Sequence, residues 1–129
     1  MKVLALDYGR ARTGVAVSDP TGQLARPLCV VERAATPAGL AELADLVRAE
    51  EVERVVVGLP LTLKGEPGEQ ARETERFIRE LRTAVDVPID SFDERFTTDL
   101  VEQAPGNAAP DAQAAAHLLT SYLARRVRS

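Results

Sequence analysis

The chain has 129 residues, a length that suits one domain with its own hydrophobic core, and we expect residues 1–129 to form that single domain. Its net charge of −4 and pI of about 5.1 argue against a passive nucleic-acid binder with a basic surface, but do not exclude a nuclease whose carboxylates hold metal ions. The lone cysteine, Cys29, excludes an internal disulfide and a thiolate metal cluster. No apolar stretch approaches the roughly 20 residues that span a membrane and no signal peptide precedes the first predicted strand, so we expect a cytoplasmic protein with no membrane contact.

The first quarter of the chain carries three apolar runs joined by short turns, a pattern that predicts an antiparallel meander of three strands. These runs are residues 2–6, 13–18 and 26–32. The spacing of apolar residues then changes to that of a helix over 36–51. There, Thr36 can cap the N-terminus and Pro37 suits the first helical position.

Strands and helices alternate over the rest of the chain, which favours parallel neighbours in the sheet and an α/β fold. Strands are expected at 53–61 and 87–92, helices at 69–85 and 111–128, and a brief helix at about 98–104. The loop 58–69 contains Lys64 and three glycines, and we interpret it as a functional loop. Two of these glycines, Gly58 and Gly65, should let the backbone approach a substrate strand closely.

Acidic side chains follow two of the predicted strands and open the last helix. Asp7 ends the first strand, Asp93 and Glu94 follow the fifth, and Asp111 begins the final helix. Because sites in open α/β sheets gather at the carboxyl ends of strands, these acids can meet at one edge. Oxygen ligands of this kind suit Mg²⁺ or Mn²⁺, and two such ions roughly 3.5–4 Å apart would stabilise the attacking and leaving oxygens of a phosphodiester displacement.

Each acid also has a purely structural interpretation. Asp7 could start a turn, and Asp111 could only cap the last helix and interact with its dipole. Asp93 and Glu94 could form a solvated strand end; if the strand continues through them, they point to opposite faces, so at most one faces Asp7. His117 lies inside the final helix without metal-ligand spacing, and we interpret it as structural.

The basic residues near these acids allow two interpretations as well. Arg10 and Arg12 on the first turn, together with Arg95 beside Glu94, could bind phosphates or simply pair with neighbouring acids. A further group near the C-terminal end of the last helix is interpreted as structural, because cations are favoured there by the helix dipole: Arg125, Arg126 and Arg128.

Four segments in this order resemble the YqgF/RuvX family, the Holliday-junction-resolvase-like proteins also regarded as pre-16S rRNA nucleases. They are "LDYGRARTGVAVSD" (6–19), "VVGLPLTLKGEPGEQA" (56–71), "DERFTT" (93–98) and "DAQAAAHLLTSYL" (111–123). The resemblance implies an RNase H-like fold with a five-stranded mixed sheet of order 3-2-1-4-5 flanked by helices. The sequence departs from the family pattern at 103–110. Family members usually have a longer, lysine-rich segment there, whereas this chain has a short uncharged one. The departure implies that this segment binds nucleic acid more weakly.

The resemblance also implies a catalytic, metal-binding set of Asp7, Glu94 and Asp111, and by analogy it selects Glu94 over Asp93. The expected activity is hydrolysis of a phosphodiester that depends on Mg²⁺ or Mn²⁺ and leaves a 5′-phosphate. The substrate would be structured RNA, in 5′-end processing of pre-16S rRNA, or branched DNA resembling a Holliday junction. Phosphates would be positioned by Arg10, Arg12, Lys64 and Arg95.

Two rival interpretations remain at this point. An actin- or Hsp70-type ATP-binding fold also places an Asp-x-Gly turn between two strands, but it needs two lobes, and 129 residues supply one. A non-catalytic module that binds nucleic acid or a protein on the same scaffold is the second rival, since three carboxylates show capacity rather than turnover. Junction cleavage would need two sites and therefore a homodimer, whereas other substrates suit a monomer.

Overall fold

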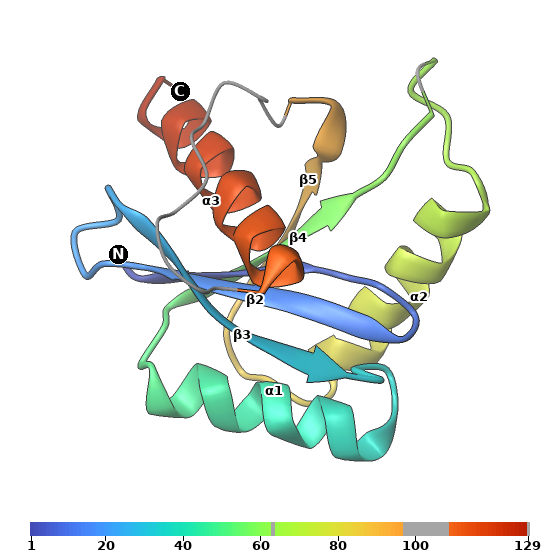
Figure 1. The fold of residues 1–129 in the computed structure, drawn as a ribbon, viewed down its shortest axis with the longest axis horizontal. Helices are drawn as coiled ribbons and strands as arrows, with labels where there is room; N and C mark the ends of the chain where they lie inside the picture. Colours follow the sequence, from blue (N-terminus) through green and yellow to red (C-terminus); the bar gives the residue numbers. More distant parts are fainter. Residues whose placement is uncertain (63, 97–108, 129) are drawn as a thin grey trace.

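The computed structural model describes residues 1–62, 64–96 and 109–128, and within them five strands form one mixed sheet (Figure 1). The strand order is β3-β2-β1-β4-β5, the order predicted above. The strands are β1 (Val3–Asp7), β2 (Arg12–Ser18), β3 (Ala25–Glu32), β4 (Arg54–Leu59) and β5 (Ile89–Asp93). The helices are α1 (Pro37–Ala49), α2 (Glu69–Arg82) and α3 (Pro110–Arg128), with a short 3₁₀ turn, η1 (Glu94–Phe96), after β5.

The predicted strand directions are confirmed. Strand β2 pairs antiparallel with both β1 and β3, whereas β4 lies parallel to β1 and to β5. Thr36 caps α1 through a hydrogen bond that its hydroxyl accepts from the Gly39 amide, and Pro37 is the first helical residue. The brief helix expected at about 98–104 falls outside the described residues.

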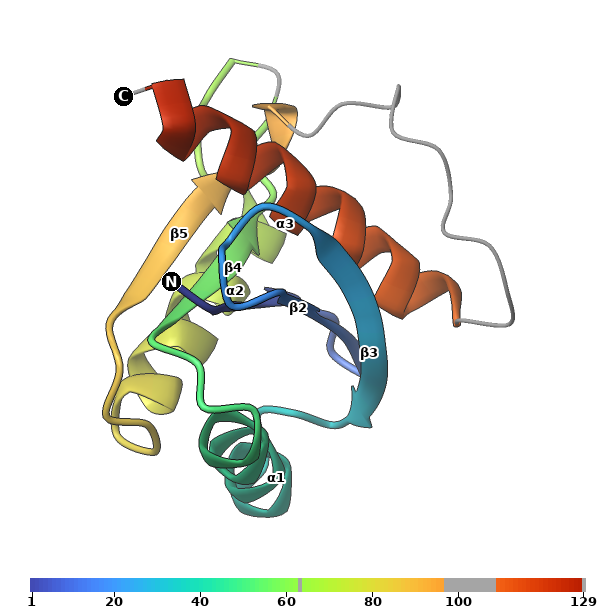
Figure 2. The same cartoon turned by 90° about the vertical axis from the view of Figure 1, so that its left-hand side faces the viewer.

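The helices cover the two faces of the sheet unequally. Figures 1 and 2 show α3 crossing one face, with α1 and α2 on the other. Side chains of β1 alternate between the two cores: Leu4 and Leu6 pack with α1 and α2, whereas Val3 and Ala5 pack with α3. The same alternation places Asp7, the next residue in the strand, on the α3 face. No helix in the described part of the chain is long and apolar enough to cross a membrane.

The first turn of α3 sits directly on strand β2 at Gly14. A Cβ built at Gly14 would collide with the backbone carbonyl of Asp111 and would lie 3.0 Å from the Ala112 amide nitrogen. Only a residue without a side chain therefore allows the helix to approach this closely. Because Gly14 is the register partner of Asp7, this contact brings the start of α3 beside the end of β1.

Candidate active site

Two carboxyl groups, those of Asp7 and Glu94, meet at the carboxyl ends of the parallel strands. Strand β5 ends at Asp93, and the 3₁₀ turn that follows begins with Glu94. The Glu94 side chain crosses strand β4 at Gly58, where an added Cβ would lie 2.5 Å from its Oε1 atom and 3.0 Å from its Cγ atom. Gly58 thus makes room for Glu94, rather than for a substrate strand as the sequence suggested.

Asp7 and Glu94 share a hydrogen bond, and the charge of Asp7 disfavours ionisation of Glu94. Burial, together with the Asp7 charge and hydrogen bond, raises the pKa of Glu94 from 4.5 to about 7. Burial and the nearby Asp111 charge raise the pKa of Asp7, although the hydrogen bond from Glu94 acts the other way. A raised pKa favours the protonated form of the pair, and a bound cation would displace that proton.

Asp111 lies close enough to influence Asp7, but its side chain is turned to a different partner. Its Oδ2 atom lies 3.1 Å from Nε of Arg12, on the adjoining strand β2. Among the described residues, no three carboxylate, imidazole or thiol groups stand together in an arrangement that could hold a metal ion. The three predicted acids therefore form a bonded pair with a third carboxylate beside it.

Asp93, the alternative to Glu94, has a different partner. Asp93 accepts hydrogen bonds from the guanidinium of Arg95, from Nε to Oδ2 at 2.9 Å and from Nη2 to Oδ2 at 2.6 Å. Its Oδ1 atom also accepts from the Arg95 amide at 2.9 Å. Asp93 thus stabilises the 3₁₀ turn that presents Glu94 to Asp7.

Three of the four basic residues predicted to bind phosphate form ion pairs in this structure. Arg10 pairs with Glu73 of α2, Arg12 with Asp111, and Arg95 with Asp93. Lys64 is exposed on the loop before α2. In that loop Gly65 has a φ of +81°, a conformation that favours glycine, and a Cβ built there would lie 3.2 Å from the Arg95 guanidinium.

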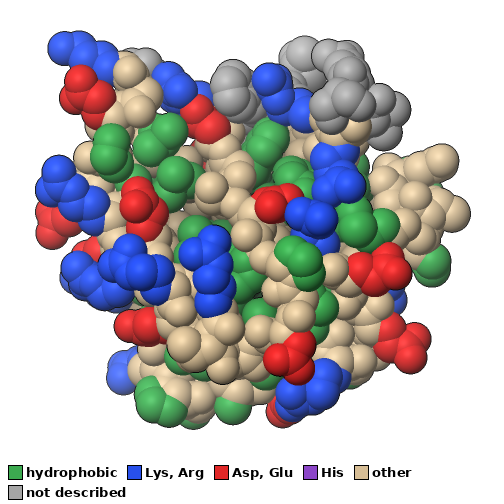
Figure 3. Space-filling view, turned by 180° about the vertical axis from the view of Figure 1, so that it is seen from behind, with side chains coloured by type: hydrophobic (Ala, Val, Ile, Leu, Met, Phe, Trp, Pro, Cys, Tyr) green, Lys and Arg blue, Asp and Glu red, His purple; other side chains and the backbone are tan. Residues whose placement is uncertain are grey.

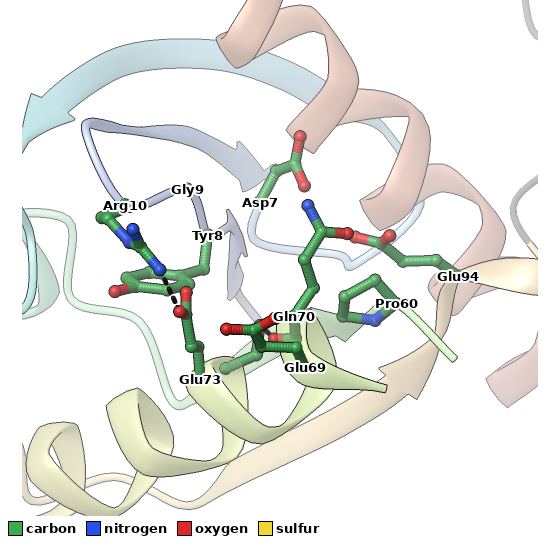
Figure 4. Close-up of a pocket in the computed structure, with 10 residues that line it drawn as sticks. Asp7, Tyr8, Gly9, Arg10, Pro60, Glu69, Gln70, Glu73 and Glu94 are labelled. Atoms are coloured by element: carbon green, nitrogen blue, oxygen red, sulfur yellow. Dashed lines mark hydrogen bonds and ion pairs between the residues drawn. The ribbon is translucent and has the colours of Figure 1, made fainter. Parts of the chain in front are cut away.

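A pocket of about 480 Å³ opens beside the acid pair, between the β1–β2 turn and the first two turns of α2. Figure 4 shows the carboxyls of Asp7 and Glu94 and the amide of Gln70 turned toward its inner end, with Glu73 and Arg10 paired farther out. Sequence reasoning missed its α2 side chains, Glu69, Gln70 and Glu73. Their only local signal was that they follow the loop already interpreted as functional.

Helix α2 also carries exposed arginines that the sequence did not single out. Arg72, Arg76 and Arg79 recur at three- and four-residue spacing and therefore lie on one side of the helix. Figure 3, which views the molecule from behind, shows basic side chains mixed with acidic ones over this part of the surface. Because acidic side chains offset these arginines, the net charge of the chain does not reveal them.

The fold matches two solved structures of RuvC. T. thermophilus RuvC in complex with a Holliday junction substrate has a TM-score of 0.63 at 18% identity, covering 98% of this chain and 96% of that one. A second Thermus thermophilus RuvC structure has a TM-score of 0.62 at 17% identity, covering 99% of this chain and 97% of that one. These matches show that the chain has the predicted RNase H-like fold.

Residues 1–125 match the family described as "RuvX: Holliday junction resolvase". The chain belongs to this family, and the predicted resemblance is confirmed. A Chloroflexus aurantiacus relative named "Putative pre-16S rRNA nuclease" is 40% identical over 96% of this chain and 87% of its own length. An Anaeromyxobacter relative (strain Fw109-5) of the same name is 42% identical over 95% of this chain and 96% of its own.

Proposed function

We propose that this protein is a metal-dependent nuclease, with Asp7, Glu94 and Asp111 as the residues that hold Mg²⁺ or Mn²⁺. The observation that carries the proposal is the half-buried Asp7–Glu94 pair at the end of β1, with the Asp111 carboxylate beside it. The donor set fits such an ion, because it consists of carboxylate oxygens, and because burial and the Asp7 charge raise the pKa of Glu94, which a cation bound to the pair would lower again. When bound, the ion would act as a Lewis acid on the phosphate and lower the pKa of a water molecule.

The residues of the chain would change partners as the site fills. Glu94 gives up its proton, so that both carboxyls of the pair are charged. Asp111 leaves Arg12 and turns to the pair, and the freed Arg12 guanidinium can then bind a phosphate oxygen. Arg10 and Arg95 are proposed to exchange their carboxylate partners for phosphates in the same way, while Lys64 adds a charge from the loop.

The first proposed substrate is structured RNA in the 5′-end processing of pre-16S rRNA, which the names of the relatives suggest. Branched DNA is the second candidate, because the family description names Holliday junctions. RNA processing needs one site and suits a monomer, whereas cutting both strands of a junction needs a homodimer. The mass of the purified protein, measured by light scattering with and without a junction, separates these two states.

Cleavage by the purified protein tests the proposal. Single-stranded RNA, a precursor-rRNA fragment and a four-way DNA junction are incubated with Mn²⁺, with Mg²⁺ or with a chelator. We expect cleavage only with metal, loss of cleavage in Asp7→Asn, and unchanged cleavage in Asp45→Asn, which alters an exposed acid of α1 paired with Arg48. Full activity in Asp7→Asn would refute the assigned site.

Metal binding is measured separately from turnover, so that a non-catalytic module is recognised. Mn²⁺ should raise the melting temperature of the wild type and of Asp45→Asn but not of Asp7→Asn, since a ligand that binds only the folded state stabilises it. Metal-dependent stabilisation without cleavage of any substrate would favour a binding module on the same scaffold.

A further inference from the structure

We propose that the pocket beside the acid pair binds the nucleoside adjacent to the cleaved phosphate and selects a base that carries an exocyclic amino group. The inference rests on the proposed nuclease function, because a phosphodiester lies beside Asp7 and Glu94 only if these residues form the proposed metal site. It adds a recognition site for the substrate, built from the first two turns of α2 and the turn after β1.

The position of the pocket supports this assignment. Asp7 and Glu94 line the inner end of the pocket. A phosphodiester bound at the metal site proposed for these acids therefore has one of its two nucleosides beside this inner end. From there the pocket runs outward along Tyr8 and Gln70 toward the Arg10–Glu73 pair (Figure 4). Its volume of about 480 Å³ falls within the range of natural small-molecule sites.

The charges in the pocket disfavour a phosphate as its occupant. Carboxyl groups come from Asp7, Glu94, Glu69 and Glu73, against the single guanidinium of Arg10 among the lining residues. Arg10 pairs with Glu73, and a phosphate that drew it away would leave all four carboxyls of the pocket unpaired with a cation among the residues that line it. Glu69 also occupies the first turn of α2, where the helix dipole would otherwise attract an anion. The part of a nucleic-acid substrate that suits these acceptors is therefore not a phosphate but a neutral base that offers hydrogen-bond donors.

The hydrogen-bonding groups match the edge of an amino-bearing base. Carboxylates accept hydrogen bonds from amino groups such as N4 of cytosine. The amide of Gln70 offers both a donor and an acceptor, and Figure 4 shows it projecting from α2 toward the acid pair. Cytosine, adenine and guanine carry an amino group, whereas uracil presents a carbonyl oxygen, which Glu69 and Glu73 would repel.

The ring of Tyr8 supplies an aromatic wall for the base. It stacks on Phe77 of α2, with ring centroids 4.3 Å apart and an angle of 16° between the planes. This contact fixes the orientation of Tyr8, and Phe77 is itself fully buried in the core. Aromatic walls of this kind contact bases without regard to sequence, so selectivity comes from the carboxylates and the amide.

Cytidine and uridine are the matched probes for this pocket, because they differ at position 4 of the base. Each is titrated into ¹⁵N-labelled protein in a chelator, without metal, and amide shifts are followed by NMR. We expect cytidine to shift the side-chain amide of Gln70 and the backbone amides of Tyr8 and Gly9. Uridine should bind more weakly by about fivefold or more, the lower end of the discrimination that a good side-chain–base pair gives.

Variants test which groups carry the preference. Glu69→Gln and Glu73→Gln should reduce the difference in affinity between cytidine and uridine, and Gln70→Ala should weaken cytidine binding. Glu75→Gln, on the same helix but outside the pocket, should change neither. Equal binding of both nucleosides, or shifts confined to residues outside the pocket, would overturn the proposal.

The cleavage assay separates a failure of this inference from a failure of the nuclease assignment. RNA substrates that differ only in C or U beside the cleaved bond should show the same preference, and Glu69→Gln should reduce it while leaving metal-dependent stabilisation intact. Cleavage without any preference for C refutes the pocket but not the nuclease. Selective cytidine binding by a protein that cleaves nothing supports the pocket and refutes the nuclease.

Discussion

Replacing Glu94 by Gln tests whether the acid pair is held together by a shared proton. In the metal-free protein, the pKa of Glu94 rises from 4.5 to about 7, so the folded state keeps a proton that the unfolded chain has lost. Stability from this group is therefore complete below about pH 4.5 and is lost as the pH rises through 7. The difference between these two pKa values corresponds to at most about 3.4 kcal/mol in the free energy of unfolding. Because Glu94 is only half-buried, solvent screening reduces it to about 1–2 kcal/mol.

The assay is urea unfolding in a chelator at pH values from 4.5 to 8, with the free energy of unfolding extrapolated to water. A Gln amide can donate to Asp7 at every pH, so Glu94→Gln should match the wild type near pH 4.5 and exceed it by about 1–2 kcal/mol at pH 8. Glu42→Gln, an exposed position on α1, should follow the wild type throughout. The reasoning is refuted if Glu94→Gln and the wild type lose stability in parallel over this range.

Three further substitutions probe the packing and pairing around the site. Gly14→Ala should destabilise the fold by about 2–3 kcal/mol in urea unfolding, because the added methyl group meets the backbone of Asp111 at the start of α3. Gly58→Ala should cost less, about 1 kcal/mol, because it displaces the movable end of Glu94, yet it should reduce metal-dependent cleavage by about tenfold or more. Arg12→Ala should bind Mn²⁺ about twofold to fivefold more tightly in calorimetry, since it frees Asp111 from an exposed ion pair, and should bind substrate more weakly.

Each of these outcomes has a matched control. Gly68→Ala places a methyl group 3.6 Å from Cγ2 of Thr62, an ordinary contact, and should leave cleavage nearly unchanged, although it weakens the N-cap of α2 by up to about 1 kcal/mol. Arg48→Ala removes an exposed arginine paired with Asp45 on α1 and should leave Mn²⁺ affinity unchanged. Weaker Mn²⁺ binding in Arg12→Ala would contradict the proposed exchange of partners at Asp111.

The sheet could be predicted from the sequence because its signals are local. Apolar runs with short turns identify the meander, and the change to helical spacing at Thr36 identifies the first parallel connection. Strand ends were less certain: the strand expected to end at residue 92 includes Asp93, and only the 3₁₀ turn after it presents Glu94 to Asp7. Periodicity cannot reveal such a turn, so the choice of Glu94 needed the family resemblance.

The surroundings of the acids could not be predicted, because they depend on contacts between distant segments. Arg10 and Glu73 are 63 positions apart, and each looks like an ordinary surface residue in its own segment. The role of Gly58 was misinterpreted for the same reason, since Glu94 reaches it from another strand. Local patterns predicted that Asp7, Asp111 and one of Asp93 and Glu94 meet at one edge of the sheet, but not which side chains pair with the basic residues.

The seating of α3 on Gly14 has a consequence for when the proposed site is complete. Asp7 and Glu94 belong to the sheet and the turn after it, whereas Asp111 belongs to α3, which contacts β1, β2 and β3. A chain that has formed its sheet but not docked α3 therefore has two of the three proposed acids in place and lacks the third. In the proposed nuclease, folding of α3 onto the sheet is thus the step that completes the metal site.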